Sequence, residues 1–524
     1  MSGLGTSTRR PFDPADARRT VFEALAQARR DHGAGTVALV DGDERTFTYD
    51  DMILASFALG SALKRGTRSG ECVGVMLPTG AAAALSFFAL SAYGRIPTML
   101  NFTSGLAGLK SALATAQVKR VVTARRLVEV AGLQALVDGL GAEIVYLEDV
   151  RKSLSLRNKL AGAAGKFAPR LLAARPDPSK PAAILFTSGT EGEPKGVALS
   201  HENILANVAQ ARAHFDFYSS DVLLNPLPAF HCFGLVVGIL LPLMIGVKTV
   251  CHPTPLQPKE IVRRIRRHGA TILISTDTFI HQYGRVSEPG DLDSLRMAVC
   301  GAERLRDETR TFLRKKTGIV LLEGYGVTEA SPVVAANQPE ANHPGTVGRM
   351  LPGIEARLDP VEGIAGGGQL HLRGPNIMLG YIKPDAPGKI VPPEGGWYNT
   401  GDIVSIDEDG FIAIRGRLKR FAKIGGEAVS LAVVENIATA LWPENAHAAV
   451  AVPDGRKGEQ IVLVTDAPEA RRVDMVGWAQ NHGVTELALP RRVVLVESIP
   501  SLATGKTDYV SVQKLAELPA DSTL

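Results

Sequence analysis

The segment Thr187-Ser-Gly-Thr-Glu-Gly-Glu-Pro-Lys195-Gly196 follows directly on the apolar stretch 182–186. A short apolar run bounded by turn residues predicts a buried strand, and the polar, glycine-rich segment after it predicts a loop at the strand's end. Backbone N–H groups, hydroxyl groups and a lysine are the groups that surround phosphate oxygens in anion-binding loops. The spacing is not that of the G-x-x-x-x-G-K-[ST] loop, because Lys195 comes three residues after Gly192. Taken alone, the segment also fits an ordinary turn.

Short apolar runs alternate with helical stretches on both sides of this loop. A hairpin is expected at 37–49, with its turn at Asp41-Gly42, followed by a helix capped near Asp50 or Asp51. The alternation predicts an α/β fold with mostly parallel sheets and flanking helices. The expected strands are 72–77, 121–123, 143–147, 182–186, 271–275, 297–300 and 319–322, and 82–90 is expected to be a helix.

The amino-acid composition and the expected secondary structure change towards the C-terminus. Residues 345–416 are rich in Gly and Pro and contain short strand-like runs such as 369–373 and 411–414, which predicts a small β-barrel-like subdomain. Beyond Arg417, about a hundred residues of alternating strands and helices suffice for one small α+β domain. The predicted organisation is an N-terminal domain over 1–417, with its β-rich subdomain at about 345–416, and a C-terminal domain over 418–524.

Composition excludes several classes of protein. The 58 Lys+Arg against 54 Asp+Glu leave a net charge of +4, too small for whole-molecule attraction to nucleic acid. Four cysteines without C-x-x-C spacing predict neither a disulfide framework nor a zinc site, and together with an N-terminus that lacks a secretory signal they favour the cytoplasm. The apolar run 232–247 has 16 residues, short of the roughly 20 that a membrane span needs, so we expect core.

Two basic stretches stand out. Residues 151–180 contain eight Lys/Arg and one acidic residue, Asp177. Either this segment is a solvated basic connector, or it is a landing site for an acidic protein or for anionic lipid headgroups at the inner membrane face. The solvent-exposed face of a later helix is expected to carry Arg263, Arg264, Arg266 and Arg267.

Five motifs occur in the order seen in the adenylate-forming superfamily of acyl-CoA synthetases, adenylation domains and luciferases, which the chain resembles over essentially its whole length. The motifs are the loop 187–196, Gly324-Tyr-Gly-Val-Thr-Glu329, Tyr398-Asn-Thr-Gly-Asp402, Gly416-Arg417 and Gly505-Lys506. The resemblance implies a mobile C-terminal domain and an enzyme that joins a carboxylate to the α-phosphate of ATP. Because two anions meet in that reaction, the site must supply positive charge and fixed dipoles.

The resemblance implies a site for ATP with Mg²⁺ as its metal. Thr328 would bond the α-phosphate, and Glu329 would ligate Mg²⁺ as a hard oxygen donor. Asp402 and Arg417 would grip the ribose hydroxyls. The residues placed around adenine are Gly301, Ala302, Glu303 and Tyr325, with the tyrosine stacked on the base. The residues that would cradle the β- and γ-phosphates are Thr187, Ser188, Gly189, Thr190 and Lys195.

The C-terminal domain would contribute Lys506. In the first half-reaction this lysine would bridge the α-phosphate and the substrate carboxylate, a task that suits a point charge on a flexible stem. In the second half-reaction the domain would turn, so that Lys506 leaves and another face admits a pantetheine thiol. Lys419 matches the hinge position. The thiol-transfer face would include Lys423, Gly425 and Gly426.

The segment 226–234 bears on the acid to be activated. Superfamily members that activate amino acids carry an Asp here to pair with the amino group, whereas this chain has His231 and no acid. An ammonium group would be left unpaired, so we expect a simple carboxylic acid and keep His231 as a candidate catalytic residue. Phe230, Phe233 and Val236 would line a pocket for a fatty acyl chain, or alternatively are plain core.

Within the superfamily the chain most resembles bacterial acyl-acyl-carrier-protein synthetases, the ligase half of bifunctional acylglycerophosphoethanolamine acyltransferase/acyl-acyl-carrier-protein synthetases. Glu191, the segment 417–431 and Ser430 carry this resemblance. It implies fatty acid activation and transfer to acyl carrier protein, with CoA as the alternative acceptor. No histidine has Asp five residues on, so an H-x₄-D acyltransferase would be a separate protein. A catalytically silent scaffold is the other alternative, because Glu191 would place an acid beside the triphosphate.

Overall fold

The computed structural model describes residues 5–188, 194–361, 364, 366–424, 427–454, 458–482, 486–501 and 507–518. The chain forms two compact units, the first comprising 1–355 with 373–398 and the second 356–372 with 399–524. Residues 399–417 thus group with the C-terminal residues. The boundary of a mobile domain after Arg417 stays a prediction.

A nine-stranded sheet in the first unit has the order β15-β14-β13-β12-β11-β9-β10-β1-β2. Pairing is parallel from β13 to β1 and antiparallel at both ends. Every residue of β9 and β11 is buried, as expected of parallel strands covered on both faces. The strands are β1 Val37–Val40, β2 Thr46–Thr48, β9 Val222–Asn225, β10 Lys248–Cys251, β11 Ile272–Ser275, β12 Met297–Cys300, β13 Leu321–Gly326, β14 Val333–Ala336 and β15 Arg349–Met350.

An eight-stranded sheet in the same unit has the order β19-β18-β8-β7-β4-β3-β5-β6. The strands from β7 to β6 pair in parallel, whereas β8, β18 and β19 are added antiparallel. The strands are β3 Cys72–Val75, β4 Ile96–Met99, β5 Arg120–Thr123, β6 Glu143–Tyr146, β7 Pro181–Ser188, β8 Pro194–Ser200, β18 Gly380–Ile382 and β19 Ile390–Val391.

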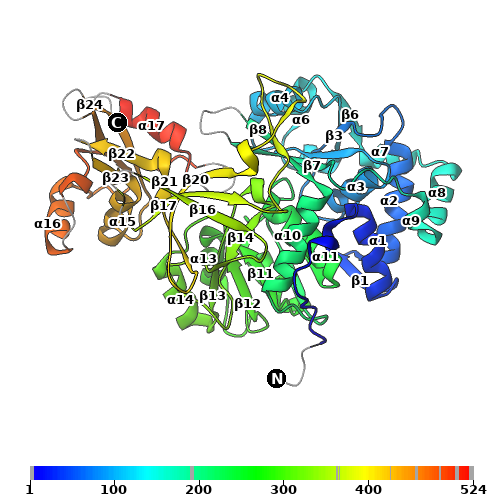
Figure 1. The fold of residues 1–524 in the computed structure, drawn as a ribbon, viewed down its shortest axis with the longest axis horizontal. Helices are drawn as coiled ribbons and strands as arrows, with labels where there is room; N and C mark the ends of the chain where they lie inside the picture. The colour runs from blue at the N-terminus through cyan, green and yellow to red at the C-terminus, as the bar shows by residue number, and fades with distance from the viewer. Residues whose placement is uncertain are drawn as a thin grey trace. The chain divides into compact units, whose positions relative to one another are not determined.

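Helices cover these sheets, and in Figure 1 the helices α1, α2, α8 and α9 lie together at one end of the first unit. The helices are α1 Val21–His32, α2 Tyr49–Leu63, α3 Ala81–Ala92, α4 Gly105–Thr115, α5 Arg125–Val130, α6 Gln134–Gly139, α7 Leu147–Lys152, α8 Leu156–Phe167, α9 Pro169–Leu172, α10 His201–His214, α11 Leu241–Ile245, α12 Pro258–His268, α13 Asp277–Val286 and α14 Asp307–Thr317. A π-helix, Phe233–Leu240, precedes α11. Among the described residues no helix has the length and apolar character that crossing a membrane requires.

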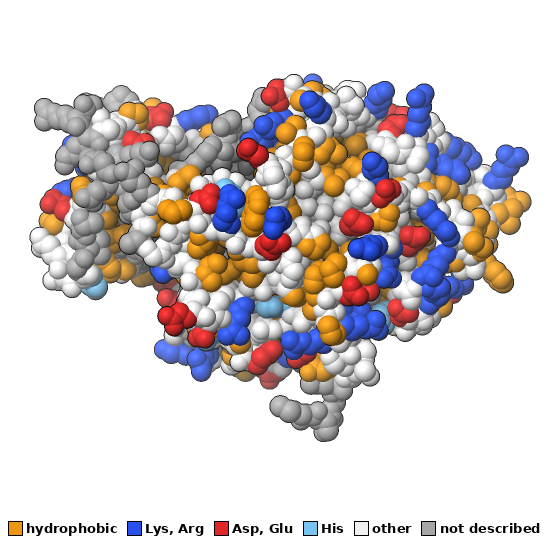
Figure 2. Space-filling view, viewed as in Figure 1, with side chains coloured by type: hydrophobic (Ala, Val, Ile, Leu, Met, Phe, Trp, Pro, Cys, Tyr) orange, Lys and Arg blue, Asp and Glu red, His pale blue; other side chains and the backbone are white. Residues whose placement is uncertain are grey.

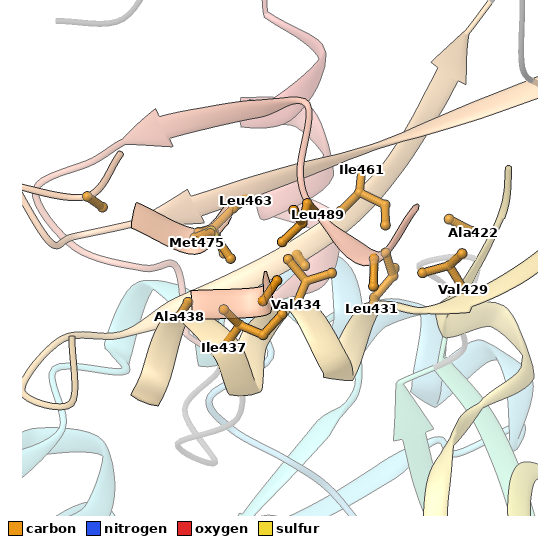
Figure 3. Packing of buried hydrophobic residues seen from close by; sticks show 14 of the residues in the cluster. Ala422, Val429, Leu431, Val434, Ile437, Ala438, Ile461, Leu463, Met475 and Leu489 are labelled. Atoms are coloured by element: carbon orange, nitrogen blue, oxygen red, sulfur yellow. The ribbon is translucent and has the colours of Figure 1, made fainter. Parts of the chain in front are cut away.

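The second unit contains two smaller sheets. The four-stranded sheet has the order β16-β17-β20-β21, and the five-stranded sheet has β23-β22-β25-β24 with β26 paired to β25. Figure 3 shows Leu431, Val434 and Ile437 of α15 pointing towards Ile461 and Leu463 of β25, so that this unit has a core of its own. Its elements are β16 Glu355–Pro360, β17 Gly368–Arg373, β20 Tyr398–Ile406, β21 Ile412–Arg417, β22 Phe421–Ile424, β23 Glu427–Ser430, α15 Leu431–Leu441, β24 His447–Asp454, β25 Gly458–Thr465, α16 Arg472–His482, β26 Arg492–Leu495 and α17 Tyr509–Glu517.

The predicted α/β class, with a large N-terminal part and a smaller C-terminal part, is confirmed. One detail is corrected, because the strands of 345–416 do not form a single barrel-like body. The strand β15 extends the nine-stranded sheet, β18 and β19 extend the eight-stranded sheet, and the remaining strands form the four-stranded sheet. The open antiparallel edge of β8 offers backbone groups that β18 satisfies.

Three local expectations are also corrected. The helix after the first hairpin is capped by Thr48, whose hydroxyl accepts the N–H of Asp51 while the Asp51 carboxylate accepts the N–H of Thr48. Residues 151–172 are not an irregular connector but contain the end of α7 and all of α8 and α9. Arg264 is fully buried, because its guanidinium donates to the carbonyl oxygens of Asp41 and Gly42, each at 2.8 Å.

Candidate active site

The predicted phosphate loop joins the two strands of a hairpin. β7 and β8 pair antiparallel, with Thr187 opposite Lys195. The Lys195 ammonium lies 5.9 Å from the centre of the Tyr381 ring, so the loop's lysine sits by an aromatic side chain. Residues 189–193, which include Gly189 and Thr190, lie outside the described residues, as does the side chain of Ser188.

Glu329 is a buried carboxylate that is fixed by a distant strand. It lies in the 3₁₀ turn Thr328–Ala330 and is 7% exposed. Tyr381 donates its hydroxyl hydrogen to Glu329 Oε1 at 2.5 Å, and the N–H of Met378 donates to the Glu329 carbonyl oxygen at 2.8 Å. Because Tyr381 lies on β18 opposite Val197 of β8, the same strand pair supports both Glu329 and the hairpin of β7 and β8.

No cationic side chain pairs with Glu329 among the described residues, since none of their ion pairs includes it. Burying a carboxylate without a cation is costly, and one neutral hydroxyl compensates only part of that cost. Among these residues there is also no cluster of three or more His, Cys, Asp or Glu that could hold a metal ion. A single carboxylate nevertheless fits Mg²⁺, which takes most of its ligands from water and from phosphate oxygens.

Tyr325 lies at an irregular point of β13. The register with β14 shifts between Tyr325 and Gly326, and such bulges re-aim side chains. A Cβ at Gly326 would lie 2.5 Å from the carbonyl oxygen of Pro332, so only glycine allows the next strand to approach this closely. The motif glycine therefore has a packing role that positions the tyrosine.

The segment 301–303 lies beside the same strand. Ala302 has φ 69°, a left-handed conformation that costs a non-glycine residue about 1–2 kcal/mol. The Glu303 carboxylate accepts hydrogen bonds from the N–H and hydroxyl of Thr278 at 3.1 and 2.9 Å, which anchor the segment to α13. Burial raises the pKa of Glu303. This arrangement makes Glu303 a support for the loop.

An apolar cavity opens between the nine-stranded sheet and the π-helix. Its volume is about 90 Å³, several times the space that one water molecule needs. Tyr325, Gly301 and Ala302 line it beside Phe233, so the predicted adenine segment and one predicted acyl-pocket residue are brought together. The other lining residues are Ala211, Phe215, Phe217, Leu223, Val237, Leu241, Ile272, Ile274, Met297, Val299, Gly324, Gly326, Pro332, Val333 and Ala336.

Two predicted acyl-pocket residues lie outside this cavity. Phe230 is buried with its ring 5.1 Å from that of Phe102, edge to face, and Val236 is buried beside Val237, which does line the cavity. The His231 ring lies 4.8 Å from the Phe230 ring. Burial, reinforced by the charge of Glu329, raises the pKa of the neighbouring Cys232 thiol, so this cysteine is a packing group.

The second unit contains the predicted ribose pair. Asp402 on β20 lies directly opposite Arg417 on β21, and Arg417 Nε donates to Asp402 Oδ1 at 3.0 Å. Asp402 is 3% exposed. Directly opposed residues of antiparallel strands have their side chains within reach of each other, which explains the ion pair.

The remaining predicted residues fall on parts of the chain that the structure does not describe. These are Lys506, Gly425, Gly426 and the side chains of Lys419 and Lys423. Conversely, sequence reasoning missed Tyr381, because a lone tyrosine in a short strand carries no motif. It also missed the apolar residues of β11, β12 and β14 that line the cavity, because buried strands look alike in sequence.

The sequence pattern of AMP-binding enzymes matches residues 25–382, and the chain belongs to this family. It is 32% identical over 346 residues to the medium-chain fatty-acid–CoA ligase of Escherichia coli (strain K12), a match that covers 64% of this chain and 61% of the ligase. It is 30% identical over 496 residues to 4-coumarate-CoA ligase 1 of Narcissus pseudonarcissus, covering 89% and 88% of the two chains. The chain thus spans only about three fifths of the bacterial ligase that it matches.

Among solved structures, ATP-bound MatB from Rhodopseudomonas palustris superposes with a TM-score of 0.81 at 24% identity, covering 95% of this chain and 98% of that one. This likeness confirms the fold. The match to AMP-binding enzymes confirms the resemblance to the superfamily. The relatives are CoA ligases and do not specifically support the narrower resemblance to acyl-carrier-protein synthetases.

Proposed function

We propose that the chain is an ATP-dependent acid–thiol ligase that activates a fatty acid and transfers it to CoA. In the first step a carboxylate oxygen attacks the α-phosphorus of ATP, the bond to the β-phosphate oxygen breaks, and pyrophosphate leaves. In the second step the thiol sulfur attacks the acyl carbon, the bond to AMP breaks, and the thiol proton passes to solvent. The thioester carries the acyl group away.

The observation that carries this proposal is Glu329, a buried carboxylate that forms no ion pair among the described residues. It lies four positions along the chain from Tyr325, which lines the apolar cavity. A bound Mg²⁺ would neutralise phosphate charge and supply the cation that this carboxylate lacks. Lys195 and Thr187, at the ends of the loop-bearing strands, would contact the β- and γ-phosphates, and Thr328 the α-phosphate. Tyr325 would stack on adenine.

The other contacts belong to the second unit. The Asp402 carboxylate would accept hydrogen bonds from the ribose hydroxyls, and Arg417 would hold that carboxylate in place. Lys506 would neutralise charge between the substrate carboxylate and the α-phosphate, and rotation about Lys419 would then exchange it for the thiol-transfer face at Lys423, Gly425 and Gly426.

The acid is proposed to be a medium- to long-chain fatty acid. No charged residue is among the described residues that line the cavity, so an amino acid or a second carboxylate would be left unpaired there. Phe233 and Val237 of the π-helix face Ile274 and Val299 of the sheet across this space. The bacterial relative is named as a ligase of medium-chain fatty acids, which supports the same class.

The acceptor is proposed to be CoA. The sequence first favoured acyl carrier protein, but the curated relatives are CoA ligases. Residues 418–524 also carry eleven Lys/Arg against thirteen Asp/Glu, which gives an acidic carrier protein no net attraction.

The test is a competition assay. In the first assay the purified chain is incubated with ATP, Mg²⁺ and fatty acids of increasing chain length, and the release of pyrophosphate is measured. In the second assay CoA and phosphopantetheinylated carrier protein are supplied together, and the thioester products are identified by mass spectrometry. We expect acyl-CoA as the main product. Exclusive acyl-carrier-protein thioester would restore the alternative acceptor, and absence of pyrophosphate with every acid would favour a silent scaffold.

A further inference from the structure

The helix α8 packs against the body of the protein through its smallest residues. Asn158, Gly162 and Gly165 are buried, and the Asn158 amide donates to the Ser61 hydroxyl of α2 at 2.6 Å. A Cβ at Gly165 would lie 2.0 Å from the Phe57 ring. At Gly162 and Gly165 the inward face of α8 therefore leaves no room for a side chain, and the helix contributes little apolar side-chain surface to the core.

The large apolar residues of α8 point the other way. Leu156, Leu160 and Phe167 are 72%, 58% and 93% exposed, and Leu171 of the following helix α9 is 79% exposed. At about 3.6 residues per turn, positions 156, 160, 163, 164 and 167 fall within about 100° of arc, so they form one outward stripe. Ala163 and Ala164 complete it and are exposed as well.

Basic residues border this stripe on both sides. By the same helical geometry Arg157 lies along one edge and Lys159 and Lys166 along the other. Arg157 and Lys159 are exposed, and Lys166 reaches Asp50 at 2.9 Å. Figure 2 shows the result at the right-hand end of the view, where hydrophobic side chains gather over the position of α8 and α9 with Lys and Arg beside them.

A stripe of this kind is unusual on a protein surface. Leucine and phenylalanine that face water gain nothing in folding, and contiguous exposed apolar surface usually marks a contact. An apolar stripe about 100° wide with basic flanks is the pattern of helices that lie in the plane of a membrane interface. The absence of any acidic residue between Lys152 and Asp177 fits an anionic partner, since nothing in that stretch would repel it.

We propose that the α8–α9 face, defined as Leu156, Arg157, Lys159, Leu160, Phe167 and Leu171, docks onto the surface of a bilayer that contains anionic lipids. The leucines and Phe167 enter the headgroup region, and the basic flanks contact lipid phosphates. The inner face of α8 packs closely on α2 through Gly162, Gly165 and the hydrogen bond from Asn158 to Ser61, so the stripe already faces outward in this structure. This proposal does not depend on which acid the enzyme activates.

The test is vesicle flotation of the full chain. Vesicles of phosphatidylcholine alone are compared with vesicles in which about one third of the lipid is phosphatidylglycerol, at low and at high salt. We expect binding to the anionic vesicles only, weakened by salt. Leu160→Ser combined with Phe167→Ser should lower binding at least tenfold, because two apolar side chains that would insert into the bilayer are lost. Arg157→Glu with Lys159→Glu should lower binding by a similar factor, because two attractive charges become repulsive.

Matched controls lie elsewhere on the first unit. Leu256→Ser removes another exposed leucine, and Arg314→Glu with Lys315→Glu reverses two exposed charges on α14. Both should bind vesicles like the unchanged chain, and circular dichroism should show all variants folded. Failure of the unchanged chain to float with anionic vesicles, or equal flotation of all variants, would overturn the proposal. So would a fall in molar mass by light scattering in the Leu160→Ser, Phe167→Ser variant without a change in flotation, because the face would then join copies of this chain.

Discussion

Glu329 and Asp402 are both buried carboxylates, 7% and 3% exposed, in different units of the chain. Asp402 has an arginine directly across the strand pair, with Arg417 Nε at 3.0 Å. Glu329 has the hydroxyl of Tyr381, and among the described residues no cation pairs with it. Both carboxylates are therefore buried, but the negative charge of Asp402 is balanced by an arginine whereas that of Glu329 meets only a neutral hydroxyl among the described residues.

The difference fits the separate roles that we propose for the two carboxylates. An aspartate already paired with a guanidinium keeps its remaining lone pairs for neutral donors such as sugar hydroxyls. A glutamate buried with only a neutral partner is stabilised when a cation arrives, which is what a magnesium-bound nucleotide would bring. Four predictions test this contrast.

The largest effect is expected for Glu329→Gln. Glutamine keeps an acceptor for Tyr381 but loses the charge, so acyl-adenylate formation should fall by about 10³-fold. Pyrophosphate release measured over a range of Mg²⁺ concentrations should also show a much weaker dependence on the metal. Unaltered Mg²⁺ dependence in a folded variant would show that Glu329 does not serve the metal.

Lys506→Ala separates the two half-reactions. Loss of the ammonium should slow acyl-adenylate formation by about 10²–10³-fold, because one preorganised charge is removed from the transition state. Thioester formation from supplied acyl-adenylate should be spared. If both half-reactions slowed equally, Lys506 would not leave the site between them. The second unit would then not supply a movable cation to the nucleotide.

Asp402→Asn should act mainly on nucleotide affinity. A hydrogen bond to a charged group is worth about 1.5–3 kcal/mol, so the KM for ATP should rise about 10–100-fold with a smaller change in kcat. Glu408→Gln, an exposed change in the same hairpin, is the control and should leave both constants unchanged. A fall in kcat as large as that of Glu329→Gln would mean that Asp402 acts in the chemical step rather than in nucleotide affinity.

The smallest effect is expected for Tyr381→Phe. The phenyl ring keeps its packing, but Glu329 loses its hydrogen bond, so kcat should fall by about tenfold or less. Raising the Mg²⁺ concentration should restore part of the loss, because the carboxylate itself remains. Steady-state kinetics at several Mg²⁺ concentrations checks this, and a loss insensitive to Mg²⁺ would mean that Tyr381 acts elsewhere.

Sequence reasoning predicted many of the buried parallel strands because they are apolar runs, and 297–300 matches β12 residue for residue. It did not predict β4, β9 and β10 of the same two sheets. Sequence reasoning also placed a glycine-rich loop at the end of a strand, and β7 does end in that segment. It assigned Asp402 and Arg417 to one predicted ribose site, and the structure pairs these two side chains. These predictions succeeded because each rests on a short motif of glycine, threonine and charged residues that can be recognised without knowing the rest of the fold.

The failures have a common cause in contacts between distant segments. Tyr381 reaches Glu329 across 52 positions, and Arg264 is buried by carbonyl oxygens more than 200 residues away. The segment that contains α8 and α9 was expected to be a solvated connector because it is a run of basic residues. The buried residues of α8 are Asn158, Gly162 and Gly165, so the usual inward apolar stripe is absent. Only the assembled fold shows which face of such a helix looks inward.

The late position of β18 in the chain has a consequence for synthesis on the ribosome. The hairpin of β7 and β8 emerges some two hundred residues before the strand that completes its sheet and brings Tyr381 to Glu329. A nascent chain that ends before β18 has every residue of the predicted phosphate loop, but β8 lacks its partner strand and Glu329 lacks the hydrogen bond from Tyr381. On the proposed function, Glu329 would gain its support only once Gly380–Ile382 has been translated, and a chain truncated before β18 would bind ATP poorly.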